Sequence, residues 1–252
     1  MCILSCINTS GFLVYGDSIG GYFIIIYSNT YHRKRGAEFM YKNGIKRLID
    51  CIVSVLALVI GALPMLIVAI SIRLESPGPV IFKQQRIGKD GKVFNILKFR
   101  SMVQNAEHTG SGVYSGEGDS RVTKVGRIIR ATSIDELPQF INILRGDMAL
   151  VGPRPPLTYH PWPYEEYTDE QKRMFEVRPG ITGWAQVNGR KEVEWHKRIE
   201  LNVWYVDHIS LLLDLKIMWF TVWKVLSNSD NENTGATVVK AETVKEKETV
   251  NK

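Results

Sequence analysis

Two adjacent carboxylic acids, Asp135 and Glu136, stand in the stretch RATSIDELPQFINILRGDM, residues 130–148. Ser133 and Glu136 have the spacing of a helix capping box, and capping alone would account for both. It leaves Pro138 unexplained, because proline belongs in the first turn of a helix rather than inside it. If the helix opens at Pro138, both carboxylates lie near its positive N-terminal end, which favours their ionised form. Such a pair suits either Mg²⁺ binding or nucleophilic attack on phosphorus.

Several arginines near turns could supply the positive charge that this chemistry needs. A guanidinium fork binds phosphate bidentately, and proline or glycine neighbours restrict the backbone that carries it. Surface arginines are common, and most of them only contact water. Five at helix ends and rigid turns nevertheless favour a phosphate-bearing substrate: Arg130, Arg145, Arg154, Arg178 and Arg190.

Other kinds of site lack their motifs in this sequence. There is no DxD motif, P-loop, GxGxxG fingerprint, GxSxG elbow or HExxH pair. The five histidines never have HxxxH spacing and the three cysteines form no CxxC, which argues against a dedicated zinc site and a disulfide framework. No nucleic-acid-binding module is recognisable either, so we expect no nucleic acid partner.

Composition and charge narrow the class of protein. Hydrophobic residues make up 44% of the 252 residues and charged residues 23%, as in ordinary globular proteins. A mean hydropathy of −0.09 excludes a transporter with many membrane spans. The net charge of +6 suits a polyanionic partner, and in the absence of a nucleic-acid module we assign it to lipid headgroups and phosphorylated substrates.

One segment is apolar enough to enter a membrane. Residues 51–72 carry no charge and would measure about 33 Å as a straight helix, which is the thickness of a bilayer core. Pro64 lies near the middle, where it removes a helix hydrogen bond and favours a kink. Basic residues flank both ends, so the segment either crosses the membrane or is a re-entrant helix, broken at Pro64, that returns to the same face.

The whole chain divides into four parts. Residues 1–39 make a poor signal peptide, and Met40 is a natural start, so we expect either that the protein begins at Met40 or that residues 1–39 are a dispensable extension. Residues 40–75 hold the membrane segment, residues 76–226 one compact domain, and residues 227–252 a polar tail that we expect to be disordered.

The compact domain is predicted to be α+β and mostly helical. Apolar runs at 80–83 and 93–99, separated by GKDG, predict a short β-hairpin. Helices are expected at 137–144, 194–209 and 211–226, residues 105–120 should form a loop, and residues 152–190 should be irregular. The last helix carries Trp219 and Trp223 one turn apart, which fits either a core helix or an amphipathic helix in the membrane interface; we favour the second.

Taken together, these motifs resemble the bacterial sugar transferases, also called small monotopic phosphoglycosyl transferases. The resemblance covers residues 40–226 and rests on five ordered motifs: ESPGPVIFKQQRIG, FNILKFRSM, SIDELPQFINILRGDMALVGPRP, VRPGITGWAQVNGR and LNVWYVDHISLLLDLKI. It implies transfer of a sugar-1-phosphate from a UDP-sugar to undecaprenyl phosphate, with release of UMP. This reaction would be the first membrane step of exopolysaccharide, capsule or glycan assembly, ahead of downstream glycosyltransferases.

The resemblance also implies roles for individual residues. Asp135 would be the nucleophile that forms a covalent phosphosugar intermediate, Glu136 its partner carboxylate, and Asp135 also the ligand of Mg²⁺. Lys98, Arg130 and Arg154 would lie near the phosphates. The domain would face the cytoplasm at the inner membrane of a bacterium, with the re-entrant helix broken at Pro64.

Two other hypotheses remain. A membrane-anchored scaffold would recruit anionic lipids or partner enzymes through its basic face, and it would tolerate Asp135→Asn. A polyprenyl-phosphate phosphatase or other hydrolase would form product without an acceptor.

Overall fold

The computed structural model describes residues 39–106, 109, 118–188 and 194–227, and chain contacts divide the protein into two units, residues 1–46 and 47–252. Of the first unit, the described part contains a π-helical turn, Tyr41–Ile45. The expectations for residues 1–38, for most of the loop at 105–120 and for the tail after Ser227 lie outside the described residues.

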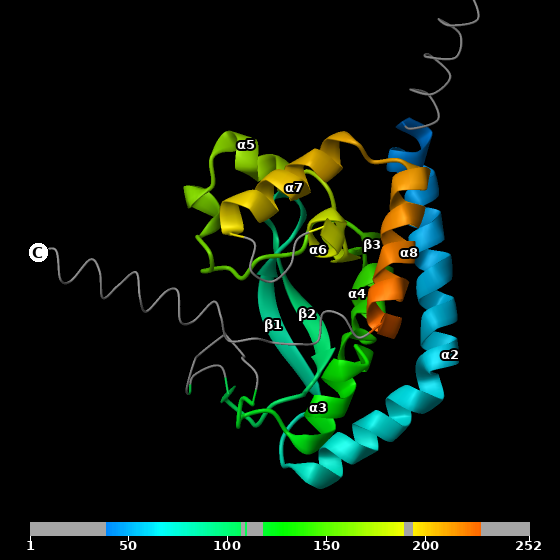
Figure 1. Ribbon diagram of the computed structural model, residues 1–252, viewed down its shortest axis with the longest axis vertical. Helices are drawn as coiled ribbons and strands as arrows, with labels where there is room; N and C mark the ends of the chain where they lie inside the picture. The colour runs from blue at the N-terminus through cyan, green and yellow to red at the C-terminus, as the bar shows by residue number, and fades with distance from the viewer. Residues whose placement is uncertain (1–38, 107–108, 110–117, 189–193, 228–252) are drawn as a thin grey trace, which may run out of the picture. The chain divides into compact units, whose positions relative to one another are not determined.

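The predicted membrane segment forms one long helix, α2 (Lys46–Glu75), which is apolar and long enough to cross a membrane. The helix continues through Pro64, and Figure 1 shows it bending between its blue and cyan halves. Only 11% of its most apolar 18-residue window is buried inside the protein. The apolar side chains of this helix therefore need a partner other than the domain, and a bilayer is the partner that its length and composition suit.

Both ends of α2 nevertheless contact the same folded domain. Near its start, Arg47 donates to the carbonyl of Ile143, and the Asp50 carboxylate accepts a hydrogen bond from the Leu150 amide. Near its end, Ile72 is buried with Phe99 and with Ile129 of α3 (Lys124–Ala131) in one hydrophobic cluster. The helix is thus joined to the domain along one side and exposed along the other.

The expected hairpin is confirmed. Strands β1 (Ile81–Ile87) and β2 (Val93–Phe99) pair antiparallel, and β1 is longer than the apolar run at 80–83 suggested. A short 3₁₀ turn joins them, with Asp90 in the left-handed region at φ 56°. Phe82 faces Lys98 and Arg86 faces Phe94 across the ladder, so Arg86 and Lys98 share one face of the hairpin.

Residues 152–190 are more regular than the sequence predicts. They contain α5 (Asp169–Lys172), α6 (Trp184–Asn188) and strand β4 (Gly180–Thr182), which pairs parallel with β3 (Ala149–Val151). The two backbones approach so closely after β3 that a Cβ atom at Gly180 would lie 2.1 Å from the amide nitrogen of Gly152. Glycine is therefore required here, and this contact brings the VGPRP and RPGIT motifs together.

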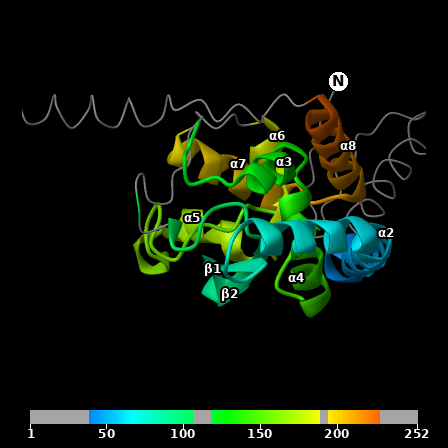
Figure 2. The ribbon, with the colours of Figure 1, turned by 90° about the horizontal axis from the view of Figure 1, so that it is seen from below.

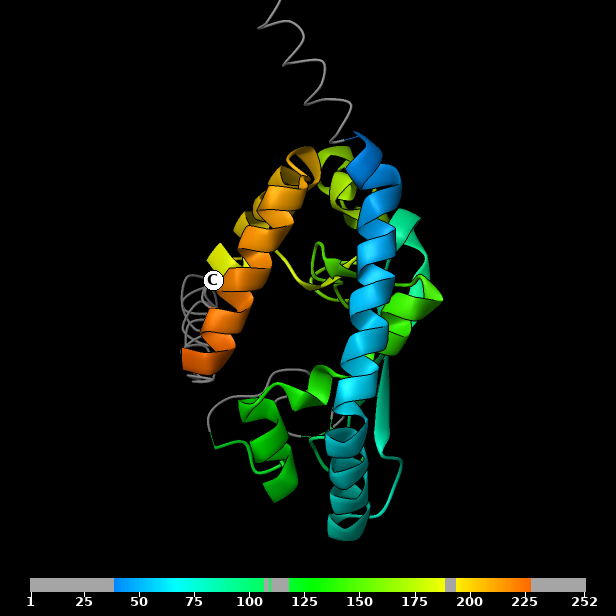
Figure 3. The same cartoon turned by 90° about the vertical axis from the view of Figure 1, so that its right-hand side faces the viewer.

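The predicted helices of the domain are present. α4 (Gln139–Arg145), α7 (Trp195–Asp207) and α8 (Leu211–Ser227) lie within a few residues of their expected ranges. Figures 1 and 2 place α8 and the first half of α2 on one side of the domain and α5 on the other. Figure 3, which looks onto that side, shows α8 and α2 close together at one end and spread apart at the other.

Helix α8 has an inverted amphipathic pattern. Its polar positions Asp214 and Thr221 face the domain with Ile217: Asp214 accepts a hydrogen bond from the Tyr205 hydroxyl, and Thr221 lies 2.6 Å from the Thr182 hydroxyl. Large apolar side chains cover the opposite face and are exposed, among them Leu212, Leu215, Trp219, Val222 and Trp223. A polar stripe turned inward and an apolar stripe turned outward is the arrangement expected of a helix in contact with lipid rather than of a core helix.

Candidate active site

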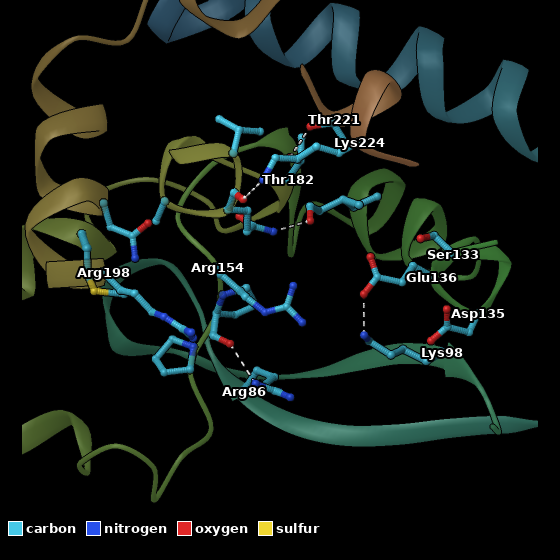
Figure 4. Close-up of a pocket in the computed structure, with 18 of the residues that line it drawn as sticks. Arg86, Lys98, Ser133, Asp135, Glu136, Arg154, Thr182, Arg198, Thr221 and Lys224 are labelled. Atoms are coloured by element: carbon cyan, nitrogen blue, oxygen red, sulfur yellow. Dashed lines mark hydrogen bonds and ion pairs between the residues drawn. The ribbon is translucent and has the colours of Figure 1, made fainter. Parts of the chain in front are cut away.

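A pocket of about 630 Å³ opens in the domain, which is the usual size of a small-molecule site. Its walls come from the β1–β2 hairpin, the segment that leads into α4, the chain after β3, and helices α6, α7 and α8. Figure 4 shows polar side chains reaching into it from several of these elements. The predicted residues Lys98, Arg130, Asp135, Glu136 and Arg154 all line this pocket.

The acidic pair lies in a 3₁₀ turn, Ile134–Glu136, immediately before α4. Ser133 adopts a left-handed conformation at φ 56° and makes no side-chain cap, so the capping-box interpretation of this stretch is wrong. Pro138 occupies the N-cap position of α4, as expected from proline's tolerance at the start of a helix. The turn and the proline together place Asp135 and Glu136 at the pocket rather than inside a helix.

Glu136 is held as an anion by two cations. Its Oε1 atom lies 2.6 Å from Nζ of Lys98, and the two side chains are 25% and 19% exposed. Burial by itself would raise the pKa of Glu136, but the charges of Lys98 and Arg154 outweigh it and lower the pKa to about 2. Glu136 therefore stays ionised at any physiological pH, and it compensates the charge of Lys98.

Asp135 is placed differently from its neighbour. Its carboxylate makes no ion pair or hydrogen bond with another side chain of the described residues. Burial is the largest influence and raises the pKa of Asp135 to about 6, against the opposing charge of Lys98. The expectation that the helix end and the arginines hold this carboxylate strongly ionised thus needs correction, because desolvation dominates. At neutral pH the group is still mostly anionic, and as a weakly solvated carboxylate it is a better nucleophile than a salt-bridged one.

Arginines occupy the middle of the pocket. Arg154 lies between two prolines after β3, and Figure 4 shows its guanidinium group pointing toward Glu136. Arg86, from β1, donates a hydrogen bond to the Pro155 carbonyl, and burial together with the nearby charge of Arg154 lowers its pKa to about 10. Arg130 lies in the last turn of α3 and donates through Nε to the Ser101 hydroxyl. Guanidinium groups in these positions suit the charges of phosphate groups.

The other arginines singled out from the sequence have different positions. Arg145 ends α4 and is exposed, and Arg178 donates to the Gly146 carbonyl; neither lines the pocket. Arg190 lies outside the described residues. Proline and glycine neighbours alone therefore do not identify which arginines belong to the site.

Several pocket residues were not predicted: Arg86, Thr182, Gln186, Arg198, Asn202, Thr221 and Lys224. For Arg86 a signal existed, since the register of the predicted hairpin puts it on the same face as Lys98. For Thr221 and Lys224 the helical spacing of three residues indicated a common face, but not that this face borders a pocket. Arg198 and Asn202 follow the same helical rule on α7, one turn apart.

The donor set of the pocket is compatible with Mg²⁺. Among the described residues there is no cluster of three or more His, Cys, Asp or Glu side chains, so a metal cage built from the protein alone is absent from that part of the chain. Mg²⁺ commonly binds one or two carboxylates and completes its shell with substrate phosphates and water. Asp135, a pocket carboxylate without an ion pair among these residues, fits that mode.

Comparison with known proteins identifies the family of the chain. Residues 41–228 match the family described as bacterial sugar transferase. EpsL of Bacillus subtilis strain 168, an uncharacterized sugar transferase, is 46% identical over 191 residues, which are 75% of this chain and 91% of EpsL. The UDP-glucose:undecaprenyl-phosphate glucose-1-phosphate transferase of Escherichia coli K12 is 42% identical over 189 residues, 73% of this chain and 40% of that protein.

A third relative differs in its sugar. The UDP-N-acetylgalactosamine-undecaprenyl-phosphate N-acetylgalactosaminephosphotransferase of Aeromonas hydrophila is 42% identical over 186 residues, 73% of this chain and 44% of that protein. The chain thus spans nearly the whole of EpsL but less than half of the other two relatives. Because the matching region extends from residue 41 to residue 228, well over half of the sequence, the chain belongs to the bacterial sugar transferase family.

Proposed function

We propose that the protein transfers a sugar-1-phosphate from a UDP-sugar to undecaprenyl phosphate and releases UMP. The names of the relatives from Escherichia coli and Aeromonas hydrophila support both substrates. A phosphate-matching pocket beside two exposed apolar helices supports the same pair, because one substrate is soluble and the other is embedded in the membrane. The product would enter exopolysaccharide, capsule or glycan assembly, where downstream glycosyltransferases would extend it.

The observation that carries this proposal is that one of the two adjacent carboxylates has an ion-pair partner and the other has none among the described residues. Glu136 is neutralised by Lys98, whereas Asp135 faces the pocket without an ion pair among the described residues. A scaffold has no use for a desolvated carboxylate in a cationic pocket. A nucleophile needs both features, since attack on a phosphate requires an accessible lone pair and cations that offset the negative charge of the diphosphate.

The reaction follows in two steps. An Asp135 carboxylate oxygen attacks the β-phosphorus of the UDP-sugar, the bond from that phosphorus to the bridging oxygen breaks, and its electron pair leaves with UMP. An oxygen of the acceptor phosphate then attacks the same phosphorus, and the bond to Asp135 breaks to restore the carboxylate. Arg154 and Arg86 would hold the phosphates throughout, and Glu136 would keep Lys98 in position. Bound Mg²⁺ would supply further positive charge next to the diphosphate.

The packing of α2 supports a monotopic arrangement at the membrane. A 30-residue helix is about 45 Å long, so one that crossed the bilayer would separate its two ends by the full membrane. Here Arg47 and Asp50 at one end, and Ile72 at the other, all contact the same domain. We therefore favour a bent, re-entrant α2 whose ends both lie on the cytoplasmic side, where UDP-sugars are present.

The decisive experiment measures UMP release from a panel of UDP-sugars with undecaprenyl phosphate and Mg²⁺. Wild-type protein should release UMP from at least one donor in an acceptor-dependent manner. Asp135→Asn should abolish release, whereas Asp169→Asn, an exposed carboxylate outside the pocket, should not. Retained activity in Asp135→Asn would exclude this residue as the nucleophile. If no acceptor is present and the amount of UMP released still exceeds the amount of enzyme, the protein is a hydrolase.

Membrane topology needs a separate test. Cysteine replacements of Lys42 and Ser76, which flank α2, can be labelled with a membrane-impermeant reagent in oriented vesicles. The re-entrant arrangement predicts that both positions react from the same face. Labelling from opposite faces would show that α2 crosses the bilayer and would overturn the arrangement, while leaving the chemistry untouched.

A further inference from the structure

Helix α8 separates the pocket from the exposed apolar surface. Thr221, Lys224 and Val225 line the pocket, and Trp219 and Trp223 on the same two turns are 68% and 63% exposed. One face of the helix therefore borders the pocket, and the other face carries exposed apolar side chains. A molecule with a charged head and a long apolar tail could contact both faces at once.

Lys224 is the cation on this wall of the pocket. Its Nζ atom lies 3.4 Å from the Gln186 carbonyl oxygen, to which it donates a hydrogen bond, and Thr221 one turn earlier is hydrogen-bonded to Thr182. Figure 4 shows Lys224 and Thr221 on the opposite wall from Arg86 and Lys98. The pocket thus has positive charge on two walls, and the wall that carries Lys224 belongs to a helix with an exposed apolar face.

Two phosphate-bearing substrates must use this pocket, and they arrive from different phases. The donor is soluble and brings two phosphates, which the cations around Asp135 and Glu136 suit. The acceptor brings one phosphate at the level of the lipid headgroups, while its isoprenoid chain stays in the bilayer. A lysine is well suited to such a ligand, because its single ammonium group binds phosphate without the fixed orientation that a guanidinium fork demands.

We propose that Lys224 binds the phosphate of the polyprenyl-phosphate acceptor, and that the exposed face with Trp219 and Trp223 contacts the first part of its apolar chain. This assignment rests on the proposed function and extends it, because it places the acceptor phosphate at the wall of the pocket that α8 forms. It predicts that the two substrates depend on different cations, with Lys224 needed for the acceptor and Arg86 and Arg154 for the donor.

The test compares Lys224→Met with Lys216→Met. Methionine keeps the apolar stem of lysine and removes the charge, and Lys216 is an exposed lysine of the same helix that lies over the Trp184 and Phe220 rings, outside the pocket. Steady-state kinetics should be measured twice in mixed micelles, with undecaprenyl phosphate varied at saturating UDP-sugar and with UDP-sugar varied at saturating acceptor. Thermal unfolding of each variant controls for folding.

Lys224→Met should lower kcat/KM for undecaprenyl phosphate by about 10- to 100-fold, the usual effect of losing one hydrogen bond to a charged group. Its kcat/KM for the UDP-sugar should stay within about twofold of wild type, Lys224→Arg should restore most of the acceptor value, and Lys216→Met should change neither. An equal loss for both substrates, or no loss for either, in a folded protein would overturn the assignment while leaving the proposed function in place. If wild-type protein turns over no UDP-sugar at all, the proposed function itself fails.

Discussion

Acidification is predicted to slow the reaction of the donor by titrating one carboxylate. Burial raises the pKa of Asp135 to about 6, so the anionic fraction of this group is about ten times larger at pH 7 than at pH 5. If Asp135 is the nucleophile, kcat/KM for the UDP-sugar should fall about tenfold over that range. We choose kcat/KM for the UDP-sugar because its pH dependence reports ionisable groups of the free enzyme and of the free donor. The donor diphosphate gains no proton between pH 5 and pH 7, so the change reports the enzyme.

The assay is initial UMP release at low UDP-sugar concentration and saturating acceptor, from pH 5 to pH 8. Glu136→Gln provides a check on the direction, since the negative charge of Glu136 is one of the influences that raise the pKa of Asp135. Removing that charge should lower overall activity. It should also shift the fall of kcat/KM at acidic pH, the acid limb of the pH profile, to lower pH. A flat profile between pH 5 and pH 7 in wild-type protein, or a limb that moves upward in Glu136→Gln, would refute the assignment of the limb to Asp135.

Protein stability gives a second measurement that does not depend on turnover. Because the pKa of Asp135 is higher in the folded protein than its ordinary value of 3.8, the folded state binds this proton more tightly than the unfolded state does. Ionised Asp135 therefore costs folding free energy above about pH 6, on the order of 2–3 kcal/mol at most. Asp135→Asn should be more stable than wild type at pH 7.5, and the difference should vanish near pH 4. Equal stability at both pH values would contradict the raised pKa.

Two further predictions concern the fold and the membrane face. Asn142 accepts a hydrogen bond from the Leu97 amide and donates one to the Asn95 carbonyl. Asn142→Leu should leave both backbone groups of β2 unpaired and lower the free energy of unfolding by about 1–3 kcal/mol for each, as measured by chemical denaturation in detergent. A decrease below about 0.5 kcal/mol would show that the two hydrogen bonds are dispensable. Trp219 and Trp223 should be quenched by brominated lipids in vesicles, and changing both to Phe should remove most of the quenching; unchanged quenching would show that other tryptophans contact the lipid.

Local signals predicted the elements that carry the acidic pair. Proline fixes its own φ and cannot donate within a helix, so Pro138 indicated that a helix opens near it; α4 begins at Gln139, two residues after the start of the range predicted at 137–144. The hairpin followed equally from two apolar runs and the glycine-rich turn between them. The capping-box spacing of Ser133 and Glu136 is also a local signal, but the interpretation drawn from it was wrong. The spacing indicates the start of a helix, whereas Ser133 adopts a left-handed conformation before a 3₁₀ turn.

The pocket as a whole could not be predicted in the same way, because tertiary contacts assemble it. Strands β3 and β4 are three residues each, too short for an alternating pattern to stand out, yet their pairing brings Arg154 and Thr182 to the same site. The sequence placed Thr221 and Lys224 on one face of a helix, but only the packed structure gives that face to the pocket. The pKa of Asp135 also depended on burial, which helix position alone does not report.

The apolar helix α2 also contacts the elements that form the site. Arg47 donates to the carbonyls of both Ile143 and Leu144 in the last turn of α4, and the Ile143 carbonyl also accepts a hydrogen bond from the Gly146 amide. Asp50 bonds the Leu150 amide in β3, and Ile72 fills the cluster between β2 and α3. The helix α4 and the pair β2 and α3 carry pocket residues, and β3 leads directly into the segment that carries Arg154. The apolar helix is therefore part of the framework that positions the pocket residues, and a substitution at Arg47, Asp50 or Ile72 should affect the site as well as the attachment of α2.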